Sequence, residues 1–148
     1  QKPIAALFDQ AKAKRVSLII RLPLASGLLG GGLHPGISFP KNDHRLFNSD
    51  GQCFNVGETF AGIPFNTGLN LVEELKTLVP EGMNLTQIAL RWILDFDAVT
   101  VVIPGSKSPN QVPENASASQ LPSLSKSLHA KLNVFYNEKI IQHIRGKY

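Results

Sequence analysis

The stretch VTVVIPGSKSP at residues 99–109 decides the fold class of this chain. Its first part is apolar and β-branched, which is typical of a strand that is buried on both faces in a parallel sheet. Pro104 and Gly105 end this strand, and Ser108 followed by Pro109 predicts the N-cap and the first position of a short helix. A buried strand that runs through a glycine-bearing turn into a helix indicates an α/β fold.

A second stretch of this kind lies near the N-terminus. Residues 16–20, VSLII, also have the pattern of a strand buried on both faces, and they follow a predicted helix over residues 4–14. The loop LPLASGLLGGG at residues 22–32 comes soon after this strand. Because the carboxyl ends of parallel strands meet at one edge, we expect the two glycine-bearing turns to lie where ligands bind in α/β folds.

Apolar residues at helical spacing predict the remaining helices. Asn84, followed three residues later by Gln87, predicts a capping box at the start of one of them, and Pro113 is expected to weaken another. Residues 34–67 have no periodicity and are rich in Gly, Pro, Asn and Asp, so they are predicted to form a long loop. The remaining predicted helices cover residues 69–79, 85–95, 111–116 and 125–144.

Only two strands are predicted, and two parallel strands can neither form a well-covered sheet nor close a barrel. Their apolar edges would stay unpaired, which native proteins normally avoid. The chain also begins at Gln1, and its only methionine is Met83. We therefore expect these residues to belong to a longer chain and to form the end of a larger parallel α/β structure.

The composition limits the functions that this chain can have. Its 148 residues are 43% hydrophobic, which argues against disorder, and its net charge of +4 is scattered without a run of Lys or Arg. No nucleic-acid partner is therefore predicted, and no apolar run is long enough to span a membrane. The single cysteine, Cys53, excludes an internal disulfide, and the four histidines show no metal-binding spacing.

The turn after residues 99–103 carries the chemistry of an anion site. Gly105 lets a ligand approach the backbone, the helix start offers unpaired amide groups, and Lys107 adds a positive charge. A phosphate with an adjacent polar heterocycle would fit here, and an ordinary capped helix with a solvated lysine is the alternative. For residues 23–29, the alternative is a connecting loop with a hydrophobic plug. The polar side chains of the turn and helix are Ser106, Lys107, Ser108, Gln111, Glu114 and Asn115.

Taken together, three stretches resemble the C-terminal part of an aldo-keto reductase of the bacterial type. They are RLPLASGLLGG at residues 21–31, LTQIALRWIL at residues 85–94 and IPGSKSPNQVPEN at residues 103–115. The sequence Asp43-His44-Arg45 in the long loop strengthens the resemblance, which covers essentially the whole chain. The two glycine-bearing motifs occur in the order and at the spacing of that family, and this combination is specific.

The resemblance implies a (β/α)8 TIM barrel that binds NADP(H) in an extended pose and reduces an aldehyde or ketone to an alcohol. Residues 1–148 would be the C-terminal part of one barrel domain, incomplete as it stands, with strands seven and eight, the closing helices and a long loop over the cofactor at residues 34–67. The implied cofactor contacts are Pro23, Leu24, Ala25 and Ser26 around the pyrophosphate, Arg45 over the adenosine end, Gly105, Ser106 and Lys107 at the 2'-phosphate, and Gln111, Glu114 and Asn115 against the adenine.

Three positions depart from the family pattern. The family often has Gly-Leu-Leu-Thr-Gly-Lys in the first loop, whereas this chain has Gly30 in place of the Thr and Gly32 in place of the Lys. One phosphate-facing cation is therefore expected to be missing. Pro113 is unusual just before the adenine contacts and is expected to tilt them.

The resemblance also implies where catalysis occurs. In this family a Tyr tuned by a Lys and an Asp acts as the general acid, and a His orients the carbonyl. All four belong to the first half of the barrel, and Tyr136 and Tyr148 lie in the wrong place, so we predict no catalytic residue and no metal ligand here.

The resemblance further implies a cytoplasmic protein that acts on a small carbonyl substrate. The chain is expected to be inactive without its partner, the missing N-terminal barrel half. The alternatives are a non-catalytic nucleotide-binding module or truncated product, and a small α/β domain that binds no nucleotide.

Overall fold

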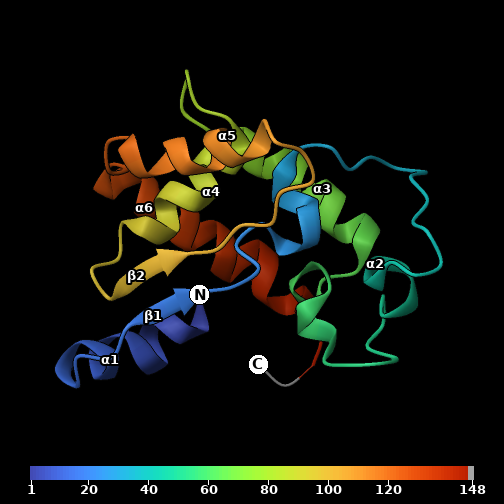
Figure 1. Ribbon diagram of the computed structural model, residues 1–148, viewed down its shortest axis with the longest axis horizontal. Coiled ribbons are helices and arrows are strands. Elements are labelled where there is room, and N and C mark those ends of the chain that lie inside the picture. The colour runs from blue at the N-terminus through green and yellow to red at the C-terminus, as the bar shows by residue number, and fades with distance from the viewer. Residues whose placement is uncertain (147–148) are drawn as a thin grey trace.

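The computed structural model describes residues 1–146, and the expectation for Tyr148 falls outside the described residues. Two parallel strands lie beside a group of helices (Figure 1). In chain order the helices and strands are α1 (Asp9–Ala13), β1 (Leu18–Ile20), α2 (His44–Phe47), α3 (Phe65–Lys76), α4 (Leu85–Leu94), β2 (Val99–Val102), α5 (Gln111–Ser117) and α6 (Lys126–Phe135). The π-helical turns are Ile4–Phe8 and Tyr136–Ile140, and the 3-10 turns are Ala25–Gly30, Val56–Glu58, Phe60–Gly62, Ala118–Gln120 and Ile141–His143.

The strands β1 and β2 pair in parallel, as the sequence predicts. The register joins Ile20 to Val102, with an irregularity beside Leu18. The amide of Ile103 extends this ladder, because it donates to the carbonyl oxygen of Ile20 at 3.1 Å. Both strands therefore direct the chain to the same edge of the sheet, where the two glycine-bearing turns begin.

The prediction that both strands are buried on two faces is wrong for the described residues. Ile19 is 60% exposed, and Val101 and Ile103 are also exposed. The physical reason is that the described part of the chain contributes two strands to the sheet, so no further strand or helix covers these side chains. Apolar strands of this kind normally lie inside a larger sheet.

The hydrophobic core lies between α3, α4 and the loops that cross them. The alternative of a connecting loop with a hydrophobic plug predicts a buried apolar side chain in residues 23–29, and the ligand role of this loop stays a prediction. Leu28, from the loop after β1, is such a side chain and fills a position against α3. Gly68 on α3 makes room for it, since a Cβ there would lie 2.9 Å from Leu28 Cδ1. The buried core cluster is Leu28, Phe60, Leu69, Val72, Leu85, Ile88 and Leu124.

The capping predictions have mixed outcomes. The capping box at α4 is confirmed, because Asn84 Oδ1 accepts from the Gln87 amide at 2.8 Å and Gln87 Oε1 accepts from the Asn84 amide at 2.9 Å. The N-cap at Ser108 is wrong, because α5 begins at Gln111 and has no side-chain cap on its N-cap residue, Asn110. The Gln111 side chain accepts hydrogen bonds from the amides of Lys107 and Ser108 in the preceding turn.

Two further expectations need correction. Pro113 does not interrupt α5, because it lies in the first turn, where an amide has no acceptor within the helix and its loss removes no bond. The loop expected over residues 34–67 contains the short helix α2 and two 3-10 turns, and its last residues already belong to α3, which begins at Phe65.

A buried ionic cluster joins α4 to α6. The Asp95 carboxylate, 6% exposed, accepts from Arg91 Nε at 3.0 Å, from His129 Nε2 at 2.8 Å and from the Leu124 amide at 2.9 Å. Burial raises the pKa of Asp95, but the hydrogen bonds from His129 and Leu124 outweigh burial, so the pKa lies below its usual value. The Asp95 carboxylate therefore accepts hydrogen bonds from α4, from α6 and from the loop before α6.

We predict that Asp95→Ala lowers the free energy of unfolding by about 2–4 kcal/mol, because it leaves Arg91 Nε, the His129 ring and the Leu124 amide without their carboxylate acceptor. The matched control is Asp97→Ala, which removes a carboxylate that is 86% exposed and pairs with Lys12. The control should change the same quantity by less than about 0.5 kcal/mol. Urea unfolding of both variants measures the difference, and equal losses would contradict the assigned role of Asp95.

Candidate functional site

The loop after β1 has an unusual backbone. Leu22, Ala25 and Ser26 have φ angles of 51°, 48° and 57°, and Gly27 follows with 100°. Each non-glycine residue in this left-handed region costs about 1–2 kcal/mol. Such conformations persist only where surrounding contacts hold them, and they concentrate at ligand-binding loops. Contacts with other segments of the chain must therefore maintain the left-handed conformation of this loop.

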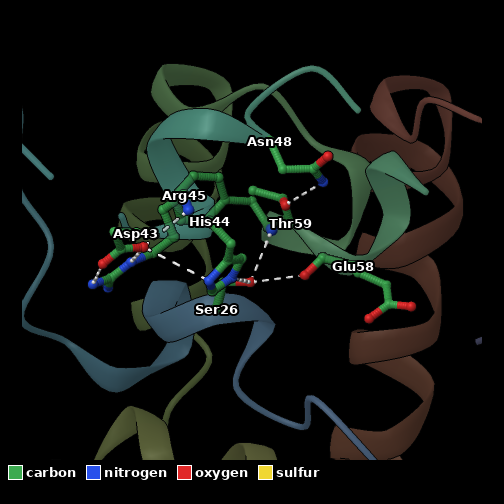
Figure 2. A network of polar contacts seen from close by, with 8 residues as sticks. Ser26, Asp43, His44, Arg45, Asn48, Glu58 and Thr59 are labelled. Atoms are coloured by element: carbon green, nitrogen blue, oxygen red, sulfur yellow. Dashed lines mark hydrogen bonds and ion pairs between the residues drawn. The ribbon is translucent and has the colours of Figure 1, made fainter. Parts of the chain in front are cut away.

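The Ser26 hydroxyl provides that support (Figure 2). Ser26 Oγ donates to the carbonyl oxygen of Glu58 at 3.2 Å and accepts from the amide of Phe60 at 3.2 Å. The third contact of Oγ is His44 Nε2, at 3.3 Å. When this ring nitrogen carries the proton, the three contacts use the one donor and both lone pairs of the hydroxyl. Ser26 therefore joins the glycine-bearing loop to the 58–60 segment.

A carboxylate, an imidazole and a hydroxyl lie next to one another at Asp43, His44 and Ser26, as in a catalytic triad. Their contacts exclude nucleophilic catalysis by Ser26. His44 Nδ1 lies 3.7 Å from Asp43 Oδ1, which is beyond hydrogen-bond distance. The Asp43 carboxylate is occupied by Arg45, and the Ser26 proton points to the Glu58 carbonyl. A triad needs the serine proton on the histidine and the histidine held by the carboxylate. These residues therefore form a structural network.

Arg45 is bound at the N-terminus of α2. Asp43 Oδ1 accepts from the Arg45 amide at 2.9 Å and from its Nε at 3.0 Å, and Asp43 Oδ2 accepts from Nη2 at 2.6 Å. The guanidinium carbon lies 4.4 Å from the Phe39 ring centre, and the side chain is 11% exposed. Arg45 Nη1 lies 3.6 Å from the ideal Cβ position of Gly27. The structure therefore brings Arg45 to the glycine-bearing loop.

The turn after β2 is organised by the side chains of α5. Gln111 Oε1 accepts from the amides of Lys107, at 2.6 Å, and Ser108, at 3.3 Å. Asn115 Nδ2 donates to Ser106 Oγ at 3.1 Å. Gly105, Lys107 and Glu114 are exposed, and a Cβ at Gly105 would meet no atom within 4 Å. This group of predicted cofactor residues therefore lies together on the surface.

The two groups of predicted residues leave the sheet at the same edge but do not bond to each other. The pairing of Ile20 with Val102 fixes the edge, and α4 packs against both the 25–30 turn and α5. Among residues 1–146, no hydrogen bond links residues 23–26 with residues 105–115. The roles assigned to these residues stay predictions.

Several residues of this network had no signal in the sequence. Asn48 and Thr59 are fully buried, and Asn48 Nδ2 donates to Thr59 Oγ1 at 3.0 Å. Asn48 Oδ1 also accepts from the amides of Cys53 and Phe54, each at 2.9 Å. An Asn in an aperiodic loop commonly binds nearby amides, and this is the only pattern that points to Asn48. Cys53 itself is an exposed free thiol.

Other kinds of site were also sought in the described residues. Within residues 1–146, no three His, Cys, Asp or Glu side chains gather closely enough to hold a metal ion. No helix in the same range combines the length and the apolar character that a membrane span requires.

Comparisons with known proteins agree with this architecture. Residues 4–137 match the model of the Aldo/keto reductase family. The chain is 30% identical over 82% of its length to the aldo-keto reductase str7 of Strobilurus tenacellus, of which the match covers 34%. It is 32% identical over 77% of its length to the L-glyceraldehyde 3-phosphate reductase of Escherichia coli strain K12, of which the match covers 32%.

A solved structure also shares the fold. The whole chain superposes on 42% of a glycerol dehydrogenase from Gluconobacter oxydans, with a TM-score of 0.73 and 19% sequence identity. The α/β fold class is therefore confirmed as part of the barrel fold of these enzymes. This chain belongs to the aldo-keto reductase family, and it spans about a third of the length of the two curated relatives.

The Asp43–Arg45 pair predicts a pH dependence. The hydrogen bond from the Arg45 side chain lowers the pKa of Asp43 from 3.8 to about 2. Because the folded pKa is the lower one, the stabilisation is fully present above about pH 3.8 and is lost as the pH falls towards 2. We predict that Asp43→Asn reduces the acid dependence of the free energy of unfolding in this window. Urea unfolding at a series of pH values measures it, with Asp97→Asn as the control for losing one exposed carboxylate.

Proposed function

We propose that this chain is the cofactor-binding, C-terminal portion of an NADP(H)-dependent aldo-keto reductase that reduces a small aldehyde or ketone. One observation carries the proposal: the amides of Lys107 and Ser108 converge on a single oxygen, Gln111 Oε1. Backbone amides that converge on one acceptor form the concave arrangement that binds phosphate oxygens. The exposed ammonium group of Lys107 supplies the charge that favours a phosphate dianion over a neutral acceptor.

The geometry of this turn fits the 2'-phosphate of NADP(H). A phosphate oxygen would take the place of Gln111 Oε1, and the Gln111 carboxamide would then be available for the adenine. Ser106 adds a hydroxyl on the same turn, where Asn115 now holds it. Glu114 is exposed on α5 and is free to approach the adenine edge.

The loop after β1 is our candidate for the pyrophosphate, through Pro23, Leu24, Ala25 and Ser26. The support is its strained backbone, since successive left-handed residues direct amides to one side. Ser26 contributes through its backbone, because its hydroxyl is engaged within the protein. Arg45 lies against this loop and would cover the adenosine end from there.

The reaction itself needs residues beyond those described. The bound nicotinamide supplies a hydride to the substrate carbonyl, and the residues of this chain bind and orient the cofactor. Tyr136 is buried in the core, and it is not available to donate a proton to a substrate. We assign the general acid to a barrel half that precedes strands seven and eight, which are β1 and β2 here. The exposed faces of Ile19 and Val101 are the surface that this half would cover.

One of the relatives supports a carbonyl substrate of modest size. The Escherichia coli relative is described as an L-glyceraldehyde 3-phosphate reductase, which is a reductase of a small aldehyde. The chain matches about a third of that protein, so the substrate is carried over only as a class.

We predict that Lys107→Ala weakens NADPH binding about tenfold or more, since a hydrogen bond to a charged group contributes about 1.5–3 kcal/mol. Binding of NADH, which lacks the 2'-phosphate, should not change. The matched control is Lys126→Ala, an exposed lysine at the start of α6. Fluorescence titration measures both cofactors. Equal effects of Lys107→Ala on NADPH and NADH would contradict the assignment, and no saturable binding by the original chain would favour a domain without nucleotide binding.

A second variant tests the convergent amides directly. Gln111→Glu places a carboxylate on the Lys107 and Ser108 amides, where it competes with a phosphate and repels it. We predict that NADPH binds more weakly to this variant and that NADH is less affected. Gln120→Glu makes the same chemical change at an exposed position of the 118–120 turn and should leave both affinities unchanged. Unchanged NADPH affinity in Gln111→Glu would contradict the site.

We also predict that the purified chain alone does not oxidise NADPH in the presence of a simple aldehyde. The absorbance of NADPH follows this reaction, and turnover above the rate without protein would contradict our assignment of the catalytic residues to another segment. NADPH binding without turnover is also what the alternative, a non-catalytic nucleotide-binding module, predicts. A coding segment upstream that carries the Asp, Tyr, Lys and His set would favour the enzyme.

A further inference from the structure

Arg145 joins the segment after the last 3-10 turn to the long loop. Its Nε donates to the Gly62 carbonyl oxygen at 3.0 Å, and its Nη2 donates to the Ser49 carbonyl oxygen at 2.9 Å. Its Nη1 binds the Asp50 carboxylate, and its amide donates to Gly62 at 3.1 Å. One side chain therefore binds both ends of the segment 49–62, and Figure 1 shows the red 144–146 segment beside this green part of the loop.

Two glycines allow the 144–146 segment to lie close to the 49–62 segment. Gly62 has a φ of 79°, and a Cβ there would lie 2.8 Å from the Arg145 carbonyl oxygen. Gly146 has a φ of 89°, and a Cβ there would lie 2.8 Å from Val56 Cγ1. Both positions exclude a side chain by conformation and by space. The 144–146 segment therefore fits the 49–62 segment closely.

The 49–62 segment in turn holds Ser26. Phe60 and Ala61 have φ angles of 50° and 54°, and the Gly62 amide donates to the Thr59 carbonyl oxygen at 2.9 Å. This tight turn presents the Phe60 amide and the Glu58 carbonyl to the Ser26 hydroxyl (Figure 2). A continuous set of contacts thus runs from Arg145 through Gly62 and Phe60 to Ser26.

We propose that Arg145 is a positioning residue for the loop after β1: it holds the 49–62 segment so that Ser26 keeps this loop in its left-handed, ligand-binding conformation. The identity of the ligand, the pyrophosphate of NADP(H), rests on the proposed function. The positioning itself rests on the contacts of Arg145 with Gly62 and of Ser26 with Phe60.

The number and kind of the Arg145 contacts separate them from an ordinary surface ion pair. Arg145 is 33% exposed, and two of its side-chain partners are backbone carbonyls on different turns. Lys139, on the preceding π-helical turn, makes one exposed contact with Glu74 at 3.4 Å. Exposed pairs of that kind contribute little to stability. Lys139→Ala is therefore a matched control that removes a cation from the same end of the chain without touching the loop.

The test compares Arg145→Ala, Arg145→Lys and Lys139→Ala in the full chain. Hydrogen exchange of the Phe60 amide, which donates to Ser26, reports the loop without any cofactor. We expect this amide to exchange about tenfold faster or more in Arg145→Ala, while the amides of α4 keep their rates. Arg145→Lys restores part of the protection, since lysine keeps the charge but loses the planar fork. Lys139→Ala leaves the rates unchanged.

The second readout is the affinity for NADPH. We expect its dissociation constant to rise about fivefold or more in Arg145→Ala and to stay unchanged in Lys139→Ala. Unchanged Phe60 exchange, or equally faster exchange at Phe60 and in α4, would overturn the positioning role. Faster Phe60 exchange with unchanged NADPH affinity would overturn the coupling to the ligand. If the original chain binds no NADPH, the proposed function fails, whereas the exchange measurement still decides the role of Arg145.

Discussion

The parallel pairing of β1 with β2 is the constraint on which the candidate site depends. It brings Ile20 beside Val102, so the chain leaves the sheet twice at the same edge and places a glycine-bearing turn there each time. The strands are short, and Ile19 stays exposed, so the ladder alone holds this arrangement weakly. The helices supply the rest, because Leu28 packs against α3 and α4 and fixes the loop after β1 to the core.

The conformation of the loop after β1 depends on the balance between its backbone strain and its hydrogen bonds. The left-handed residues Ala25 and Ser26 cost about 1–2 kcal/mol each, whereas each hydrogen bond of the Ser26 hydroxyl returns about 1 kcal/mol. These quantities are nearly equal, so the contacts with Glu58 and Phe60 offset much of the strain, beside the packing of Leu28 against the core. Because the strain and the hydrogen bonds nearly cancel, a change in the position of the 58–60 segment alters the conformation of the loop. Arg145 holds that segment, and it therefore affects the loop although it does not contact Ser26.

The sequence predicts correctly those elements that are determined by a few neighbouring residues. The capping box of Asn84 and the parallel strands follow from short stretches, and the structure contains both. The failures have non-local or competing causes. Ser108 has the residue type of a cap, but α5 begins at Gln111, and the amides of Lys107 and Ser108 donate to the Gln111 side chain. The contact of Ser26 with Glu58 spans 32 positions of an aperiodic loop, and no periodicity records such a pairing. The family resemblance indicates where the candidate site lies, whereas the hydrogen bonds of Ser26 within the site join residues that are far apart in the sequence and leave no pattern in it.

Several of the predicted cofactor residues already have hydrogen-bond partners within the chain. Gln111 binds the Lys107 amide, Asn115 binds Ser106, and Arg45 is bound within its own loop by a carboxylate. A ligand that only exchanged one neutral hydrogen bond for another would gain almost nothing, because the net contribution of each is about 1 kcal/mol. A phosphate dianion is different, since charge-assisted bonds are about twice as strong and Lys107 adds its own attraction. If the proposed site is right, this turn would therefore select for the charge of its ligand.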